Sequence, residues 1–97
     1  MFDRLELNLI LDLYGRMVAA GHWRDYALEL GRDAAIFSAF RRASERPEAQ
    51  VHKIPALRFK QGQFALIGEA GATLRRGHDL RGVLAPLERR LLRLVEA

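Results

Sequence analysis

The sequence predicts an α+β fold: an N-terminal helix, an antiparallel meander of four or five strands and a C-terminal helix. Apolar residues recur with helical spacing in residues 4–20 and 80–95, and with alternating spacing in the stretches between them. We expect both helices to pack on one face of the sheet. A chain of 97 residues holds one hydrophobic core, so residues 1–97 are predicted to form a single domain.

The first predicted helix covers residues 4–20. Asp3 can cap its start, with Glu6 three residues later in a variant of the capping box, and Gly21 supplies a C-terminal stop. Its polar residues form one stripe, whereas apolar side chains spread over most of the remaining circumference. So wide an apolar arc is either buried between the sheet and the last helix or forms the seam of a homodimer.

The middle of the chain predicts strands. Residues 26–30 alternate in polarity and, after a short turn at 31–33, pair with a second strand at 35–42. A loop at 44–49 precedes a third strand at about 51–60, which Pro55 should place at an edge, bulge or break because proline cannot donate to a ladder. Two short strands at 64–67 and 73–75 complete the meander.

The last predicted helix carries an apolar stripe that keeps its phase from Leu80 to Val95. Pro86 lies inside this helix and projects to the opposite, solvent side. Proline removes the hydrogen bond to the carbonyl of Gly82, so it should kink the helix, with two shorter helices as the alternative.

Composition excludes several classes of protein. The chain has no cysteine, which excludes disulfide scaffolds, thiol catalysis and cysteine-ligated metals. Its size excludes large nucleotide-dependent enzymes, and we expect no cofactor. Acidic residues interrupt the N-terminal apolar stretch and no apolar run is long enough to span a membrane, so a cytoplasmic protein without membrane contact is expected.

A first candidate site, for an anion, precedes the last helix. Arg75, Arg76, Gly77 and His78 could form a nest for phosphate at the helix N-terminus. Asp79 is a natural N-cap, however, and would occupy the donors that a phosphate needs. We therefore favour capping over anion binding at this position.

A second candidate site is the loop His22, Trp23, Arg24 and Asp25. A histidine, an indole, a cation and a carboxylate in sequence could grip a ligand or form a catalytic corner. A tryptophan in such a loop more often folds back as a lid on the core, with the charged residues solvated, and this is the favoured interpretation.

Metal binding and hydrolysis find little support in the sequence. The three histidines are scattered, with no pair spaced for one helix face, so no metal site is predicted. No serine or threonine lies in a nucleophile elbow.

A basic surface is the third candidate. The net charge is +4, and Arg41, Arg42, Arg89 and Arg90 are the residues we would map on the central strands and the last helix. Phenylalanines at positions 37, 40, 59 and 64 lie on predicted strands beside basic residues, a pattern used to stack single-stranded nucleic acid. The core needs these phenylalanines, which favours the structural interpretation.

Four segments together resemble the pattern of a domain-of-unknown-function family of short proteins found mainly in alphaproteobacteria: Leu13–Gly21, Trp23–Ala27, Phe37–Arg42 and Arg76–Leu80. The resemblance covers essentially the whole chain. It implies a bacterial, cytoplasmic source and one self-contained domain, and it transfers no activity, substrate or catalytic residue.

Three functional hypotheses follow. The first is a non-enzymatic binding or protein-interaction module, with a homodimer or another protein as partner, suggested by the wide apolar arc of the first helix. The second is a weak binder of nucleic acid or another polyanion through the basic strands and last helix. The third is a small enzyme, which would require the His22–Asp25 and His78–Asp79 corners to converge on one pocket.

Overall fold

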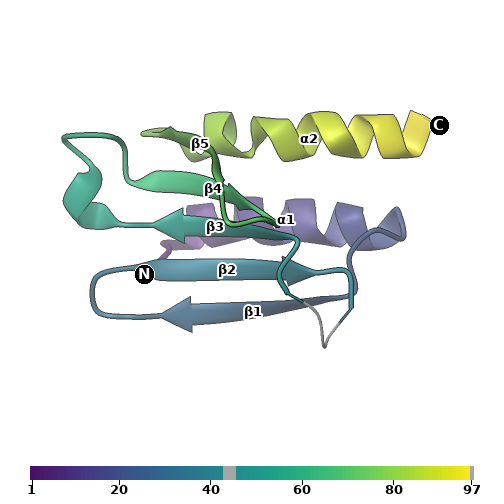
Figure 1. The fold of residues 1–97 in the computed structure, drawn as a ribbon, viewed down its shortest axis with the longest axis horizontal. Helices are drawn as coiled ribbons and strands as arrows, with labels where there is room; N and C mark the ends of the chain where they lie inside the picture. The colour runs from purple at the N-terminus through teal and green to yellow at the C-terminus, as the bar shows by residue number, and fades with distance from the viewer. Residues whose placement is uncertain (43–45, 97) are drawn as a thin grey trace.

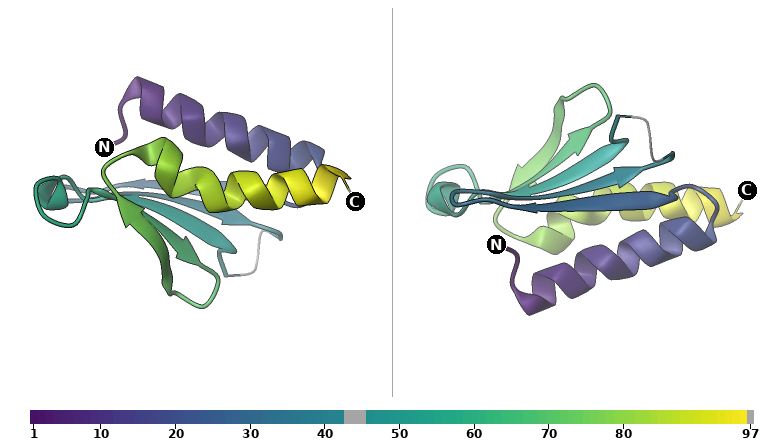
Figure 2. Two further views of the ribbon diagram at one scale, coloured as in Figure 1. Left: turned by 90° about the horizontal axis from the view of Figure 1, so that it is seen from above. Right: turned by 90° about the horizontal axis from the view of Figure 1, so that it is seen from below.

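The computed structural model describes residues 1–42 and 46–96 and confirms the α+β prediction (Figure 1). Five strands form one antiparallel sheet in the order β1-β2-β3-β4-β5, so every strand pairs with its neighbour in sequence. Both helices cover the same face of this twisted sheet, as the two views of Figure 2 show. The elements are α1 (Arg4–Ala19), β1 (Asp25–Leu30), β2 (Ala35–Phe40), β3 (Ala49–Lys53), η1 (Pro55–Leu57), β4 (Phe64–Gly68), β5 (Thr73–Gly77) and α2 (Leu80–Glu96).

Helix α1 begins with the predicted capping box. The carboxylate of Asp3 accepts a hydrogen bond from the backbone N–H of Glu6, and the carboxylate of Glu6 accepts one from the backbone of Asp3, both at 2.8 Å. The helix ends at Ala19, and Gly21 follows with a φ of 77°, the left-handed conformation that glycine adopts without strain. The sequence therefore predicted both ends of α1 to within a residue.

Strand β5 runs on to Gly77, past its predicted end at 75, and two other strands needed correction. Strand β2 ends at Phe40, before the predicted end at Arg42. Strand β3 runs from Ala49 to Lys53 instead of from 51 to 60. Ala49, the last residue of the predicted loop at 44–49, therefore belongs to the strand. Residues 44 and 45 of that loop lie outside the described part of the chain.

Pro55 explains the correction to β3. Strand β3 stops two residues before it, and Pro55 opens the 3-10 helix η1, where the missing N–H needs no partner. The prediction of a broken strand is therefore confirmed. The edge position, one of the alternatives, does not apply, because β3 lies in the centre of the sheet between β2 and β4.

Helix α2 continues through Pro86 as one helix, so the alternative of two shorter helices is wrong. Proline at position 86 leaves the carbonyl of Gly82 without its helical donor. A terminal nitrogen of Arg75 donates to that same carbonyl at 3.0 Å. Strand β5 thus supplies the hydrogen bond that the helix lacks.

The core lies between the sheet and the two helices. Phe37, Val51 and Leu66 face it from three neighbouring strands, and Leu13 and Leu84 face it from the helices. The apolar arc of α1 is only partly covered, since Leu5 and Val18 remain exposed. Within the described residues, neither helix is both long and apolar enough to cross a membrane.

Candidate anion-binding pocket

A buried carboxylate organises one end of the molecule. Glu48 immediately precedes β3 and is only 6% exposed. Its backbone N–H donates to the carbonyl of Ala39 at 2.8 Å, which ties the residue to the end of β2. A charged group is stable in a buried position only where it finds charged or hydrogen-bonding partners.

Three side chains meet one oxygen of Glu48. Oε1 lies 2.7 Å from His22 Nε2, accepts a hydrogen bond from Trp23 Nε1 at 3.1 Å, and pairs with a terminal nitrogen of Arg90 at 2.7 Å. The other oxygen, Oε2, lies 3.3 Å from Arg41 Nε, in an ion pair without hydrogen-bond geometry. The carboxylate therefore joins the loop after α1, the end of β2 and the second half of α2.

The end of α1 sets the position of His22 and Trp23. The backbone N–H groups of both residues donate to the carbonyl of Met17, at 2.9 and 3.4 Å, so the chain folds back over the last helical turn. The indole of Trp23 stacks on Tyr14, with 6.0 Å between ring centroids, and is almost completely buried. The prediction that Trp23 is a lid on the core is confirmed.

Arg41 is held at one edge of its guanidinium and exposed at the other. Its Nε faces Glu48, whereas the side chain as a whole is 59% exposed. Because the guanidinium is planar and rigid, orienting Nε also orients the two terminal nitrogens. The two terminal nitrogens carry four further N–H donors for an acceptor in the pocket.

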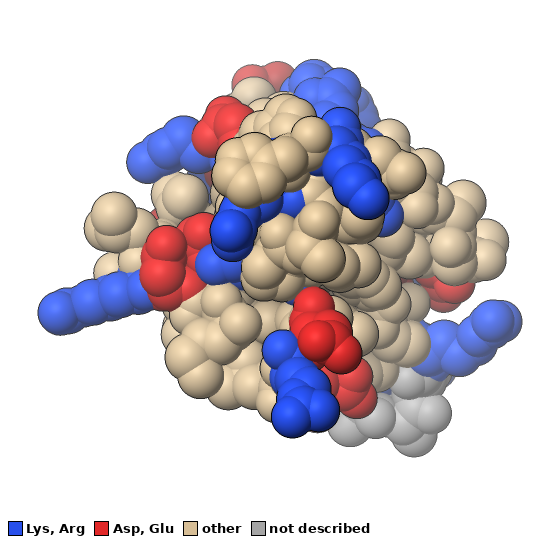
Figure 3. Space-filling view, turned by 90° about the vertical axis from the view of Figure 1, so that its left-hand side faces the viewer, with Lys and Arg blue, Asp and Glu red and all other residues tan. Residues whose placement is uncertain are grey.

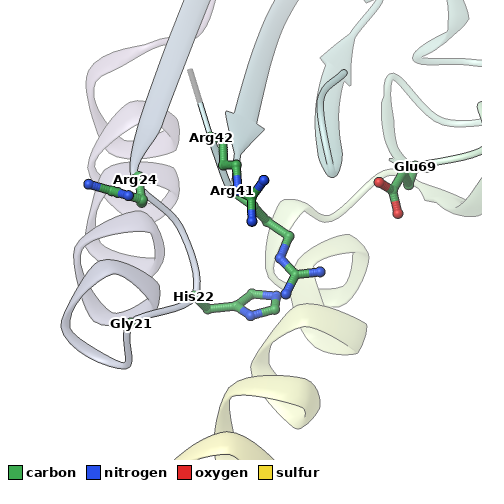
Figure 4. Close-up of a pocket in the computed structure, with 6 residues that line it drawn as sticks. All are labelled: Gly21, His22, Arg24, Arg41, Arg42 and Glu69. Carbon is green, nitrogen blue, oxygen red and sulfur yellow. The ribbon is translucent and has the colours of Figure 1, made fainter. Parts of the chain in front are cut away.

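A pocket of about 310 Å³ opens beside this cluster. Figure 4 shows His22 and Arg41 on one side, Glu69 facing them from the turn between β4 and β5, and Arg24 pointing away from the centre. The described residues that line the pocket are Gly21, His22, Arg24, Arg41, Arg42 and Glu69. With Arg24 turned outward, two arginines and a histidine line the pocket against a single glutamate, which favours an anionic occupant.

The four residues of the candidate loop His22–Asp25 have different roles in the structure. His22 and Trp23 contact Glu48, and Arg24 lines the pocket although its side chain turns outward. Asp25 begins β1, and its carboxylate accepts a hydrogen bond from the N–H of Tyr26 at 2.8 Å. Asp25 is not among the residues that line the pocket.

The four arginines of the candidate basic surface do not all lie at the same place. Arg41 and Arg42 line the pocket, and Arg90 reaches Glu48 from α2. Arg89 is exposed on α2 and does not line the pocket. Two sequence segments that were considered separately, the loop after α1 and the end of β2, thus contribute to one site.

The predicted nest Arg75–His78 does not form one site. Arg75 donates to the carbonyl of Gly82, and Arg76 donates to that of Gly62 at 3.4 Å, so the two guanidinium groups serve different backbone positions. Asp79 caps α2, with its carboxylate accepting from the N–H of Gly82 at 3.2 Å. The cap occupies a donor that a phosphate would need.

The two histidine corners are not brought together. Asp79 directly precedes α2, whereas Arg90, which shares Glu48 with His22, lies eleven residues further along the chain, about 16 Å at the helical rise per residue. Among residues 1–42 and 46–96, no group of three or more His, Asp or Glu side chains is arranged to hold a metal ion.

Sequence reasoning missed Glu48 and Glu69. Glu48 lies in the most loop-like stretch of the sequence, beside Pro47, where a carboxylate is normally solvated. Its partners come from three distant segments, so neither spacing nor periodicity marks it. Glu69 lies in a predicted turn, and only the sheet topology places that turn opposite Arg41.

Comparison with known proteins identifies a family. The model of a family described as "Protein of unknown function (DUF2794)" matches residues 1–84. The chain belongs to this family. The match covers α1, the whole sheet and the start of α2, and it ends before Arg90. Neither the curated proteins nor the solved structures give a match.

Proposed function

We propose that this DUF2794 protein is a binding module for a small ligand with a carboxylate or phosphate group, which the pocket between His22, Arg41 and Glu69 receives. The observation that carries the proposal is the grip of Glu48 on both His22 and Arg41. Because Glu48 pairs with Nε of Arg41 at 3.3 Å, the terminal N–H groups of this guanidinium remain donors for a second acceptor. Arg42 adds a further cation to the same wall.

The dimensions favour a small ligand. A volume of about 310 Å³ is at the lower end of the range of ligand pockets, roughly 300–1,000 Å³. Glu69 faces the arginines and would accept a hydrogen bond from a hydroxyl or ammonium group on the far end of the ligand. The preferred ligand therefore carries an anionic group and a donor group a few bonds apart.

A long polyanion is a weaker candidate. Arg90 is paired with Glu48, and Arg75 and Arg76 donate to backbone carbonyls, so three arginines of the candidate sets already have acceptors. Figure 3 draws the end of the molecule opposite the pocket, and there Lys and Arg lie in separated groups, with uncharged surface and acidic side chains between them, so this end offers no continuous basic track. A nucleic-acid track would need a more continuous basic surface.

Binding is also better supported than catalysis. His22 directs Nε2 to Glu48, and no hydroxyl side chain is among the described residues that line the pocket. A nucleophile and a base in hydrogen-bond contact are what acyl or phosphoryl transfer through a covalent intermediate would require. A cytoplasmic location stays a prediction from the sequence.

The test is a titration followed by two-dimensional NMR of the labelled backbone amides. Inorganic phosphate and citrate serve as probes, with sodium chloride at matched ionic strength as the reference. We expect saturable shifts at residues 21–24, 41 and 69, and an Arg41→Gln variant should weaken phosphate binding about tenfold, the effect of about 1.4 kcal/mol. Arg89→Gln, the same charge change on exposed α2 surface, should leave the Kd unchanged.

Two results would refute the proposal. Shifts that follow ionic strength alone, without saturation, would show that the pocket has no affinity for these anions. Equal weakening by Arg41→Gln and Arg89→Gln would show that the arginines act through net charge alone.

A further inference from the structure

The two edges of the sheet differ in how well they are protected against pairing with another strand. Strand β5 carries Arg75 and Arg76, and its pairing with β4 is interrupted by a register shift at Leu66 and Ile67. Charges and bulges of this kind are common guards of an edge strand. Strand β1 also carries two charges, Asp25 and Glu29, but it has an unbroken register with β2 over all its residues and contains no Pro or Gly.

The outer backbone groups of β1 belong to its apolar residues. The N–H of Gly31 donates to the carbonyl of Ala34 at 2.9 Å, and bonded and non-bonded pairs alternate along an antiparallel ladder. Counting back from this pair, Glu29, Ala27 and Asp25 bond to β2. The N–H and C=O groups of Tyr26, Leu28 and Leu30 therefore point away from the sheet.

A contact at Tyr26 supports this assignment independently. Its N–H donates to the carboxylate of Asp25 at 2.8 Å. The backbone N–H of Tyr26 thus already has a local acceptor in the Asp25 carboxylate, whereas the N–H groups of Leu28 and Leu30 lie at the open edge. Figure 1 shows β1 as the outer strand of the sheet, with α1 behind the neighbouring strands β2 and β3.

The side chains of these residues form an apolar border on the helix-covered face. Tyr26, Leu28 and Leu30 are 45%, 37% and 51% exposed. They continue the surface of α1, where Tyr14 contacts Tyr26 at 5.0 Å between ring centroids and Val18 is exposed. Part of the wide apolar arc of α1 therefore ends at the same open edge.

We propose that β1 pairs with β1 of a second copy of this chain, antiparallel about a twofold axis at Leu28, so that two five-stranded sheets become one. The pairing places Leu28 opposite its own copy and Tyr26 opposite the partner's Leu30, and each of these residues has outward backbone groups. Both helical layers then lie on the same side of the joined sheet, and the exposed borders of the two α1 helices meet.

Charge selects this register over its closest competitor. A twofold axis at Ala27 would overlap the same number of strand residues, but it would set Asp25 directly opposite Glu29 at both ends of the pair. Like charges directly opposite one another are destabilising in an antiparallel pair. The axis at Leu28 places Glu29 opposite Ala27 instead, and Asp25 opposite Gly31.

The mass of the protein in solution is the first test. Sedimentation equilibrium over two decades of concentration should give a mass that rises to two chains. Leu28→Lys, which sets two lysines against each other at the axis, should shift the dimer dissociation constant upward at least tenfold. Leu74→Lys makes the same change at an exposed apolar residue of β5 and should leave the dimer intact.

Engineered cysteines test the register, because the natural chain has none. With the axis at Leu28, a Leu28→Cys pair lies about 5.5 Å apart between Cα atoms, within disulfide range. An Ala27→Cys pair is then diagonal, at about 7–8 Å, and too far. Leu28→Cys should form covalent dimers in mild oxidant and Ala27→Cys should not.

Three outcomes would overturn the inference: a monomer at every concentration, a dimer that Leu74→Lys breaks and Leu28→Lys does not, or crosslinking at Ala27→Cys instead of Leu28→Cys. The inference does not depend on the proposed anion pocket, because none of the described pocket residues belongs to β1, and Arg24 only precedes its first residue.

Discussion

The pKa of His52 is set by its position on the sheet face that the helices leave uncovered. It lies on β3, where its Nε2 contacts Gln50 Oε1 at 3.2 Å, and the amide of Gln50 donates to Ser38 on β2 at 2.9 Å. Burial lowers the pKa of His52, and the nearby cation of Arg76 lowers it further, against a smaller opposing effect from Glu29. The folded protein therefore favours neutral His52.

This preference predicts a pH dependence of stability. As the pH falls through the ordinary pKa of histidine, the unfolded chain binds a proton that the folded protein resists, so His52 lowers the free energy of unfolding at acidic pH. A His52→Gln variant should lose less stability than the wild type between pH 7 and pH 5, as measured by urea unfolding. Parallel curves for the two proteins would contradict the prediction.

Gly62 is a second residue whose role follows from local geometry. Its φ is 99°, and a Cβ atom would lie 2.4 Å from the carbonyl carbon of Gly77. Gly71 has a similar φ of 87° but open space around it. The two glycines share the same conformational demand and differ in steric contact.

Substitution by alanine should separate these two effects. Gly71→Ala should lower the free energy of unfolding by about 1–2 kcal/mol, the strain of a residue with a side chain in the left-handed conformation. Gly62→Ala should cost clearly more, because the backbone of Gly77 must also move. Thermal unfolding of both variants measures the difference, and equal losses would show that the turn at Gly62 shifts without cost.

At the scale of elements, α2 and β5 share a hydrogen bond that makes Pro86 tolerable. The carbonyl of Gly82, which Pro86 leaves without a helical donor, accepts from Arg75. Arg75, which the sequence suggested as an anion ligand, has this structural contact instead of a place in the pocket. Because Arg75 is exposed, this hydrogen bond is weak, but its acceptor is the carbonyl that Pro86 leaves without a helical donor.

A double-mutant cycle tests this assignment. Pro86→Ala restores an N–H for Gly82 and should raise stability, since proline costs about 3 kcal/mol in a helix interior. Arg75→Met should cost about 0.5–1.5 kcal/mol with Pro86 present, the value of an ordinary hydrogen bond. The loss should be smaller when Arg75→Met is combined with Pro86→Ala. Additive effects in chemical denaturation would show that the two sites are independent.

The same elements show which features a sequence predicts. The ends of α1 follow from Asp3, Glu6 and Gly21, all within a turn of the boundary they set. Strand β3 was placed too far along the chain because its apolar pattern continues past Lys53, and only Pro55 marks the break. Its central place in the sheet depends on pairing with β2 and β4, which no local pattern contains.

At the scale of the whole molecule, charged contacts connect layers that are distant in sequence. Lys53 on β3 meets Glu6 on α1 at 2.6 Å, and Arg16 on α1 forms two hydrogen bonds to Glu88 on α2, at 2.9 and 2.7 Å. Glu48 connects α2 to the loop after α1. The sequence could suggest His22, Arg41 and Arg90 one by one, but their common partner exists only in the folded chain.

Glu48 should therefore matter for stability as well as for the pocket. Glu48→Ala leaves the indole N–H of buried Trp23 without an acceptor, a cost of about 1–3 kcal/mol. Glu48→Gln keeps an acceptor for the indole but removes the charge that faces Arg41 and Arg90. Its free energy of unfolding should therefore lie between those of Glu48→Ala and the wild type. Glu69→Gln, at an exposed turn, should stay within about 0.5 kcal/mol of the wild type in urea unfolding.

Self-association through β1 would make stability depend on concentration. A dimer that dissociates on unfolding is favoured by mass action, so the melting temperature should rise with protein concentration in the wild type and in Leu74→Lys. In Leu28→Lys it should become independent of concentration, while the monomer keeps its core, because Leu28 is partly exposed at the edge. Scanning calorimetry of the three proteins makes the comparison. A wild-type melting temperature that stays constant over two decades of concentration would contradict the dimer. Strand β1 would then be an unpaired edge, and its apolar border would need a different partner.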